Sequence, residues 1–168
     1  ISDTGGFVYS NTSARSFTIA SELMHRDLDL RQITYRLFHE SSQAKLRLKG
    51  YFCTKARFSY SDRVVSASVD PATLDRFQAT DDDLDGMINE LKNVAGVDLA
   101  MILRMQADGQ IRVNLRTSTA VDASQLAARF GGGGHPRAAG MTLAGLSLAE
   151  AEKLLLEKAG DALSTPCA

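Results

Sequence analysis

The stretch VDLAMILRMQADGQIRVNLRTS, residues 97–118, joins two different strand patterns through a turn. Residues 97–105 are almost wholly apolar, which predicts a strand covered on both faces. Asp108-Gly109 predicts a hairpin turn. In residues 111–116 apolar and polar side chains alternate, which predicts a strand with one buried face. The stretch therefore predicts the centre of a β-sheet.

Helix and strand patterns alternate on both sides of this centre. A β-branched run at 64–69 and an apolar run at 141–143 predict two further strands. Asp122 predicts the start of a helix, and Ser147 with Glu150 predicts the capping box of a closing helix. Strands interleaved with helices predict an α/β domain, with a mixed sheet and flanking helices.

The first fifty residues are predicted to be mainly helical. Residues 1–9 predict the end of a strand, and helical spacing then continues towards Gly50, which we expect to interrupt it. We expect a helical part over 1–45, a connector over 46–62 and the sheet domain over 63–168. Because the sequence begins with isoleucine rather than methionine, we expect it to belong to a longer protein.

Composition and charge narrow the choice of partner. No apolar run reaches the roughly 18 residues of a membrane span, and no signal peptide is visible, so we expect a cytoplasmic protein without a membrane partner. Cys53 and Cys167 lie far apart without metal-ligand spacing, as ordinary thiols of a reducing compartment do. The segment 31–60 has one acid, Glu40, and an excess of basic residues that fits either a polyanion-binding surface or a solvated helix face. The basic residues are Arg31, Arg36, Lys45, Arg47, Lys49, Lys55 and Arg57.

The sequence GGGGHPRAAG, residues 131–140, is the strongest candidate for a binding site. Consecutive glycines are entropically costly, and we expect these to form a nest of backbone N–H groups that binds a phosphate. The four are Gly131, Gly132, Gly133 and Gly134. His135 follows them and can donate a hydrogen bond to the same anion. A flexible linker is the less specific alternative.

Arg116 and Ser118 lie at the end of the preceding predicted strand. A guanidinium beside hydroxyl groups suits bidentate recognition of a phosphate, although Arg116 alone also fits an exposed strand-end charge. At the other end of the chain, Asp3 opens the segment DTGGF. A carboxylate beside a glycine turn suits a hard metal ion, but one carboxylate is too few for a site, and a plain turn residue is the simpler interpretation.

Three segments in this order, DTGGFVYSNTS at 3–13, RTS at 116–118 and GGGGHPRAAG at 131–140, resemble the DHH-family phosphoesterases. The most similar branch contains oligoribonucleases and 3′-phosphoadenosine-5′-phosphate (pAp) phosphatases, and is often labelled exopolyphosphatase-related. The resemblance implies that this chain is the C-terminal part of such an enzyme: the tail of the catalytic DHH domain, a connector and the DHH-associated substrate-binding domain. The family's Asp-x-Asp segment and Asp-His-His triplet are absent from the sequence.

The resemblance also implies roles for single residues. Family members use a two-manganese (Mn²⁺) centre, of which Asp3 would be the last ligand motif, and the centre would be incomplete in this chain. The arginine, serine, glycines and histidine named above would hold the phosphate or the terminal nucleotide of the substrate across an interdomain cleft. The implied partners are a short oligonucleotide, a mononucleotide or pAp, and the missing N-terminal DHH half, while a homodimer is left open. We expect the chain alone to bind nucleotides weakly and to hydrolyse nothing.

Two other functions stay open. A similar glycine–histidine domain ends some alanyl-tRNA synthetases, which implies a non-catalytic module that binds nucleic acid. A polyphosphatase is the second, because the sequence does not separate a nucleotide from a polyphosphate chain. The DTGGF segment and the absence of a long coiled-coil connector favour the phosphoesterase.

Overall fold

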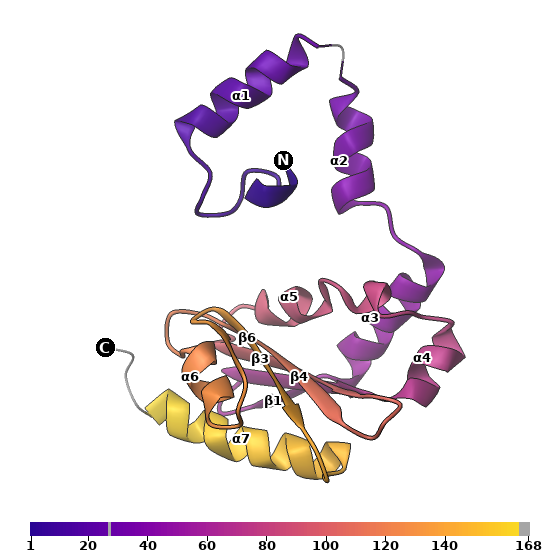
Figure 1. Cartoon of the computed structure of the whole chain (residues 1–168), viewed down its shortest axis with the longest axis vertical. Helices are drawn as coiled ribbons and strands as arrows, with labels where there is room; N and C mark the ends of the chain where they lie inside the picture. Colours follow the sequence, from indigo (N-terminus) through magenta and orange to yellow (C-terminus); the bar gives the residue numbers. More distant parts are fainter. Residues whose placement is uncertain (27, 165–168) are drawn as a thin grey trace. The chain divides into compact units, whose positions relative to one another are not determined.

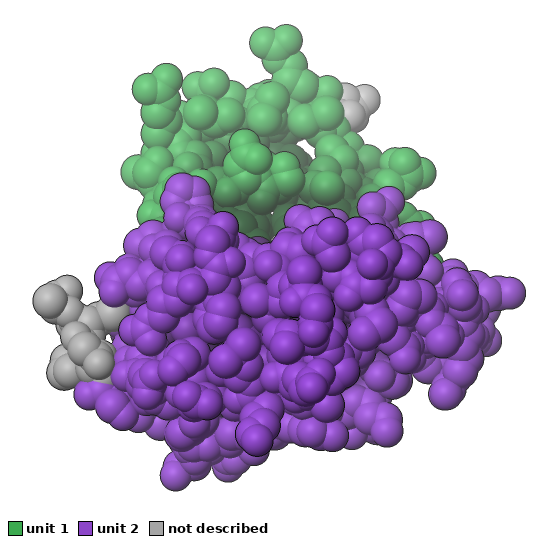
Figure 2. Space-filling model, turned by 60° about the horizontal axis from the view of Figure 1, so that its bottom comes forward, with its two compact units in different colours: residues 1–42 green, residues 43–168 purple. Residues whose placement is uncertain are grey.

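The computed structural model describes residues 1–26 and 28–164 and consists of two compact units, residues 1–42 and 43–168 (Figure 1, Figure 2). Cys53 is a free, exposed thiol, and Cys167 lies outside the described residues. None of the helices within the described ranges has the length and apolarity needed to span a membrane. The domain limits expected from the sequence, 1–45, 46–62 and 63–168, assign a functional role to each segment. These assignments stay predictions.

The first unit is helical and begins with a 3-10 turn. Its elements are η1 (Ser2–Thr4), α1 (Ala14–Met24) and α2 (Leu30–Phe38). The strand predicted at 1–9 is wrong, because Gly5, Gly6 and Phe7 have φ angles of 55°, 68° and 71°. Three consecutive residues in the left-handed region cannot continue an extended strand.

The first unit has no hydrophobic core of its own among the described residues. No side chain of η1, α1 or α2 is buried. Large apolar side chains such as Phe17, Leu23 and Leu37 are about half exposed. Helices in proteins depend mainly on the burial of an apolar face, and exposed apolar side chains of this kind are typical of an interaction surface.

The second unit is built on a six-stranded mixed sheet of order β1-β2-β3-β4-β6-β5. β2 and β3 are parallel, and all other neighbouring strands are antiparallel. The predicted α/β class with a mixed sheet is therefore confirmed. The strands are β1 (Arg57–Ser59), β2 (Val64–Val69), β3 (Leu99–Met105), β4 (Ile111–Thr117), β5 (Gly133–His135) and β6 (Ala138–Leu143).

Helices lie on both faces of this sheet (Figure 1). α6 (Ala123–Ala128) and α7 (Leu148–Ser164) pack on one face, over the apolar side chains of β3, β4 and β6. The opposite face is covered over β2 and β3 by α3 (Gln43–Lys55), α4 (Pro71–Phe77), the 3-10 turn η2 (Asp82–Leu84) and α5 (Met87–Lys92).

Gly50 lies inside α3 and does not interrupt it, contrary to the sequence prediction. Leu48 and Phe52 of the same helix are buried in the core with β2. A glycine in a helix interior costs about 1 kcal/mol, and the burial of these two side chains offsets that cost. Tertiary packing thus overrides the local propensity.

The helices on the second face cover β2 and β3, and only α5 reaches the near side of β4. Ala100 and Ile102 of β3 are buried, whereas Arg112 and Asn114 on the same face of β4 are exposed. We call the part of the sheet over β4, β6 and β5 that no described helix of the second unit covers the open face. Its residues are Arg112, Asn114, Arg116, Gly133, His135, Ala138, Gly140 and Thr142.

Candidate functional site

The open face brings together two candidate residues that are 19 positions apart. Arg116 of β4 lies opposite Ala138 of β6, and Ala138 lies opposite His135 of β5. Residues directly opposite each other in antiparallel strands point to the same face, so Arg116 and His135 project from the same side. Two strand spacings separate their Cα atoms by about 10 Å. A phosphate or a flat base fits between two side chains at that separation.

The neighbouring row of the open face has almost no side chains. Asn114 of β4 lies opposite Gly140 of β6, which lies opposite Gly133 of β5. Beside this row is an open hollow without an acidic residue, which suits an anion. Its lining residues are Gln106, Arg112, Asn114, Gly131, Gly132, Gly140, Met141 and Thr142.

The glycine segment is mainly an edge strand and not the open loop that its sequence predicts. Gly133–His135 pair with β6 as β5. The N–H groups of Gly131 and Gly132 donate to the carbonyl oxygens of Ala128 and Ala127, at 3.1 and 3.0 Å. Both N–H groups thus already have a backbone acceptor, and the role of the two glycines in binding an anion stays a prediction.

The fold requires some of the four glycines but not all. Gly131 and Gly134 have φ angles of 73° and 147°, which favour glycine. A Cβ atom on Gly132 would lie 2.3 Å from the carbonyl oxygen of Gly140. Gly133 has neither constraint: a Cβ atom there would meet nothing within 4 Å. The backbone at Gly133 is therefore open to close approach from outside the fold.

Arg116 is half buried, and its Nη1 donates to the carbonyl oxygen of Leu115 at 3.1 Å. No carboxylate pairs with Arg116 among the described residues. The guanidinium charge is therefore available to an anion on the open face.

Ser118 has a structural partner. Its hydroxyl donates to Oδ1 of Asp98 at 2.6 Å, and its N–H donates to the Asp98 carbonyl at 2.8 Å. Nε of Arg63 donates to the same carboxylate at 2.7 Å. Burial acts to raise the pKa of Asp98, but the hydrogen bonds from Ser118 and Arg63 outweigh it, so the pKa lies below its ordinary value. These contacts hold the end of β4 against the start of β3.

The turn between β5 and β6 is tied to the same strand end. The Thr117 hydroxyl donates to the carbonyl oxygen of Pro136 at 2.9 Å, and the Arg137 guanidinium donates to the carbonyl oxygen of Ser118. These bonds fix the position of His135 relative to Arg116. A pre-organised pair loses less conformational entropy on binding.

Asp3 lies in η1 and its side chain is exposed. Its carbonyl oxygen accepts a hydrogen bond from Nδ2 of Asn11 at 3.0 Å, which fixes the turn but not the carboxylate. In the part of the chain that the structure describes, no three His, Cys, Asp or Glu side chains are grouped so that they could hold a metal ion. A two-metal centre therefore does not fit these residues alone.

The sequence prediction did not include Arg112 and Asn114 among the site residues. Both alternate with the buried Ile111, Val113 and Leu115, so their position on the polar face of β4 was readable from the sequence. Which part of that face stays uncovered was not readable, because it depends on where α3 to α5 pack.

Comparison with known proteins gives consistent matches. Residues 61–165 match the family model of the DHHA1 domain. The chain is 31% identical over 165 residues to the bifunctional oligoribonuclease and PAP phosphatase NrnA of Thermus thermophilus, covering 98% of this chain and 48% of the relative. It is 27% identical over 157 residues to the protein of the same name from Bacillus subtilis, covering 94% and 48%.

A solved structure has the same fold. An exopolyphosphatase-related protein from Bacteroides fragilis superposes with a TM-score of 0.85 at 26% identity, over 98% of this chain and 49% of that chain. The chain thus spans about half the length of the relatives that it matches.

Proposed function

The chain belongs to the DHHA1 domain family, and on that premise we propose that it is the substrate-binding part of a metal-dependent DHH-family phosphoesterase. The proposed reaction is hydrolysis of phosphodiester or phosphomonoester bonds in short oligonucleotides or pAp. The names of the Thermus and Bacillus relatives, oligoribonuclease and PAP phosphatase, support this substrate class.

The single observation that carries the proposal is the register of Arg116 and His135 on the open face. The guanidinium offers two parallel N–H donors to one phosphate, and the imidazole offers a donor from the other side. Gly133 lies in the neighbouring row of the open face, opposite Gly140, and its lack of a side chain lets a ligand approach the backbone closely. Together these groups bind and orient the terminal phosphate or nucleotide of a substrate.

We assign the chemical step to residues outside the given sequence. The first unit lacks buried side chains, as a fragment of a larger domain would, and Asp3 offers one exposed carboxylate. The family resemblance names manganese as the ion, which would activate water and stabilise negative charge on the phosphoryl group. Since one carboxylate does not build such a centre, the chain alone should bind substrate without hydrolysing it.

Titration of the 168-residue chain with pAp and with a dinucleotide tests the binding site. We expect Arg116→Ala and His135→Ala each to weaken binding about tenfold, as for loss of a charge-assisted hydrogen bond. Lys153→Ala is the matched control, because Lys153 is exposed on α7, on the opposite face of the sheet. Equal affinity of all four proteins would remove the proposed site.

A second assay tests the proposal that this chain binds substrate but does not hydrolyse it. Manganese-dependent release of mononucleotide from a dinucleotide by this chain alone would contradict it. The same assay on the natural protein that contains this sequence separates a phosphoesterase from a non-catalytic nucleic-acid-binding module. A protein that binds both ligands and releases neither mononucleotide nor phosphate would be such a module.

A further inference from the structure

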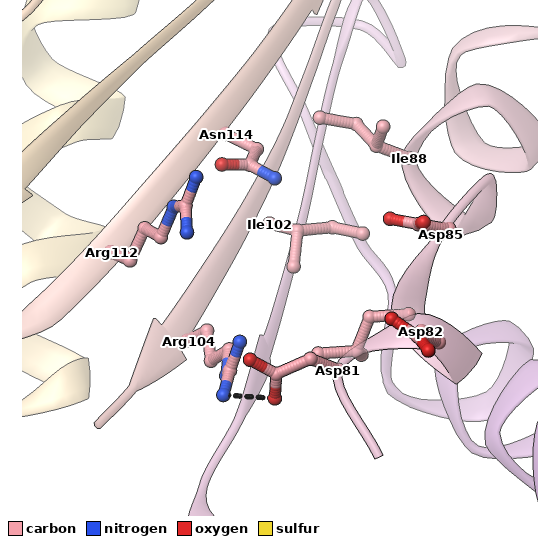
Figure 3. A pocket seen from close by; sticks show the side chains of 9 residues that line it. Asp81, Asp82, Asp85, Ile88, Ile102, Arg104, Arg112 and Asn114 are labelled. Atoms are coloured by element: carbon pink, nitrogen blue, oxygen red, sulfur yellow. Dashed lines mark ion pairs between the residues drawn. The ribbon is translucent and has the colours of Figure 1, made fainter. Parts of the chain in front are cut away.

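A second hollow adjoins the open face where η2 and α5 lie beside β3 and β4 (Figure 3). Carboxylates line the wall formed by η2 and the start of α5, and basic and amide side chains line the wall formed by the strands. The polar residues are Asp81, Asp82 and Asp85 on the first wall and Arg104, Arg112 and Asn114 on the second. Arg112 and Asn114 also line the acid-free hollow beside the glycines. These two residues therefore lie between the two hollows.

The two arginines of this wall differ in their partners. Arg104 of β3 lies directly opposite Arg112 of β4, a placement in which like charges repel. Arg104 is paired with Asp81, as Figure 3 shows, and its Nε is buried without an acceptor among the described residues. Arg112 is exposed, and within 1–26 and 28–164 no hydrogen bond or ion pair engages it. Of these two arginines, Arg112 therefore carries the charge that a bound anion can neutralise.

The surroundings of Arg112 decide where an anion would lie. On the η2 side, three carboxylates repel it. On the glycine side, the hollow offers Asn114, Thr142 and bare glycine backbone, and no acid. An anion at Arg112 is thus directed away from η2, towards Asn114 and Thr142 on the same face as Arg116.

We infer that Arg112 and Asn114 form a second phosphate subsite, so that the open face takes oligonucleotides in preference to mononucleotides or pAp. The inference rests on the proposed function for the first subsite at Arg116 and His135. Arg112 and Arg116 are four residues apart on one strand, which separates their Cα atoms by about 13 Å. A stacked strand rises about 3.4 Å per nucleotide along its axis and an extended strand rises more, so this distance corresponds to roughly two to four nucleotide steps. The two phosphates of pAp belong to one nucleotide and are too close together to span it.

Affinities for pAp and for a 5′-phosphorylated pentaribonucleotide test the second subsite. We expect Arg112→Ala to weaken binding of the pentanucleotide about fivefold, the upper range for an exposed ion pair, and to leave the affinity for pAp unchanged. Arg112→Lys should keep most of the affinity because it keeps the charge. Arg116→Ala should lower the affinity for both ligands, and Lys153→Ala should lower the affinity for neither.

The outcomes separate the two proposals. Arg112→Ala could leave the affinity for the pentanucleotide unchanged, or lower the affinity for pAp by the same factor. Either result would overturn the proposal of a second subsite and leave the first subsite unaffected. If Arg116→Ala changes neither affinity, the proposed function fails and the second subsite with it.

A polyphosphate chain presents similarly spaced phosphates, and a further arm distinguishes it. Short-chain polyphosphate competes against the labelled pentanucleotide. Competition only at polyphosphate concentrations well above the dissociation constant of the RNA supports the oligonucleotide. Tight polyphosphate binding that Arg112→Ala weakens, with no measurable binding of RNA, overturns that assignment.

Discussion

Arg116 and His135 face the same side of the sheet, with Ala138 in register between them. If a ligand lies over this alanine, then Ala138→Leu should block it without removing any charge. Overpacking a contact costs about 1–3 kcal/mol, so we expect the affinity for pAp to fall about tenfold or more. Thermal unfolding should change little, because the new side chain projects from the open face. Ala128→Leu, at an exposed position of α6, is the control, and wild-type affinity in Ala138→Leu would show that the ligand binds elsewhere.

Gly132 and Gly133 are adjacent, but their substitutions should have opposite effects. A Cβ atom at 132 would lie 2.3 Å from a backbone oxygen, whereas at 133 it meets open space. We expect Gly132→Ala to lower the free energy of unfolding by about 1–3 kcal/mol. Gly133→Ala should leave stability unchanged or raise it by up to about 1 kcal/mol, and yet weaken binding of pAp severalfold. Unaltered binding in a stable Gly133→Ala protein would mean that no ligand approaches this backbone closely.

The contact of Ser118 and Arg63 with Asp98 predicts a pH dependence of stability. These hydrogen bonds hold the pKa of Asp98 below its ordinary value. A carboxyl group with a lowered pKa stabilises the fold above its unfolded pKa of about 3.9 and loses this effect as the pH falls through the folded pKa. Asp98→Asn should therefore cost about 1–3 kcal/mol at neutral pH, with a smaller difference from wild type below about pH 4. Urea unfolding at both pH values measures this, and an equal difference at both would exclude the carboxylate charge as its source.

Patterns of neighbouring residues correctly predicted the two central strands and the start of the closing helix. The two patterns in 97–118 are β3 and β4, and the Ser147 hydroxyl and Glu150 carboxylate form the expected capping box, with Ser147 N–H donating at 2.9 Å. The resemblance to the DHH family is confirmed by the match of residues 61–165 to the DHHA1 domain. The sequence could show it because the resemblance depends on short motifs. The strand at 1–9 and the break at Gly50 were wrong, because a left-handed turn and tertiary packing override propensity there.

The candidate site was predicted in its residues but not in its geometry. Arg116, Gly133 and His135 were named from the sequence, but their common face follows from the pairing of β4 with β6 and of β6 with β5. Such pairing joins distant segments, and no local pattern encodes it. Their roles in binding stay predictions, as does the metal role of Asp3.

Lys49 and Arg57 belong to the basic segment 31–60, but each already has a carboxylate partner. Lys49 pairs with Glu90 at 2.9 Å and Arg57 with Glu152 at 3.1 Å. A neutralised charge releases few counterions when a nucleic acid binds. We therefore expect Lys49→Ala and Arg57→Ala to leave the slope of log affinity against log salt unchanged, whereas Arg116→Ala should reduce it by about 0.7. Pentanucleotide titrations between about 50 and 200 mM salt measure these slopes, and a clear flattening in Lys49→Ala would instead support a polyanion-binding surface along 31–60.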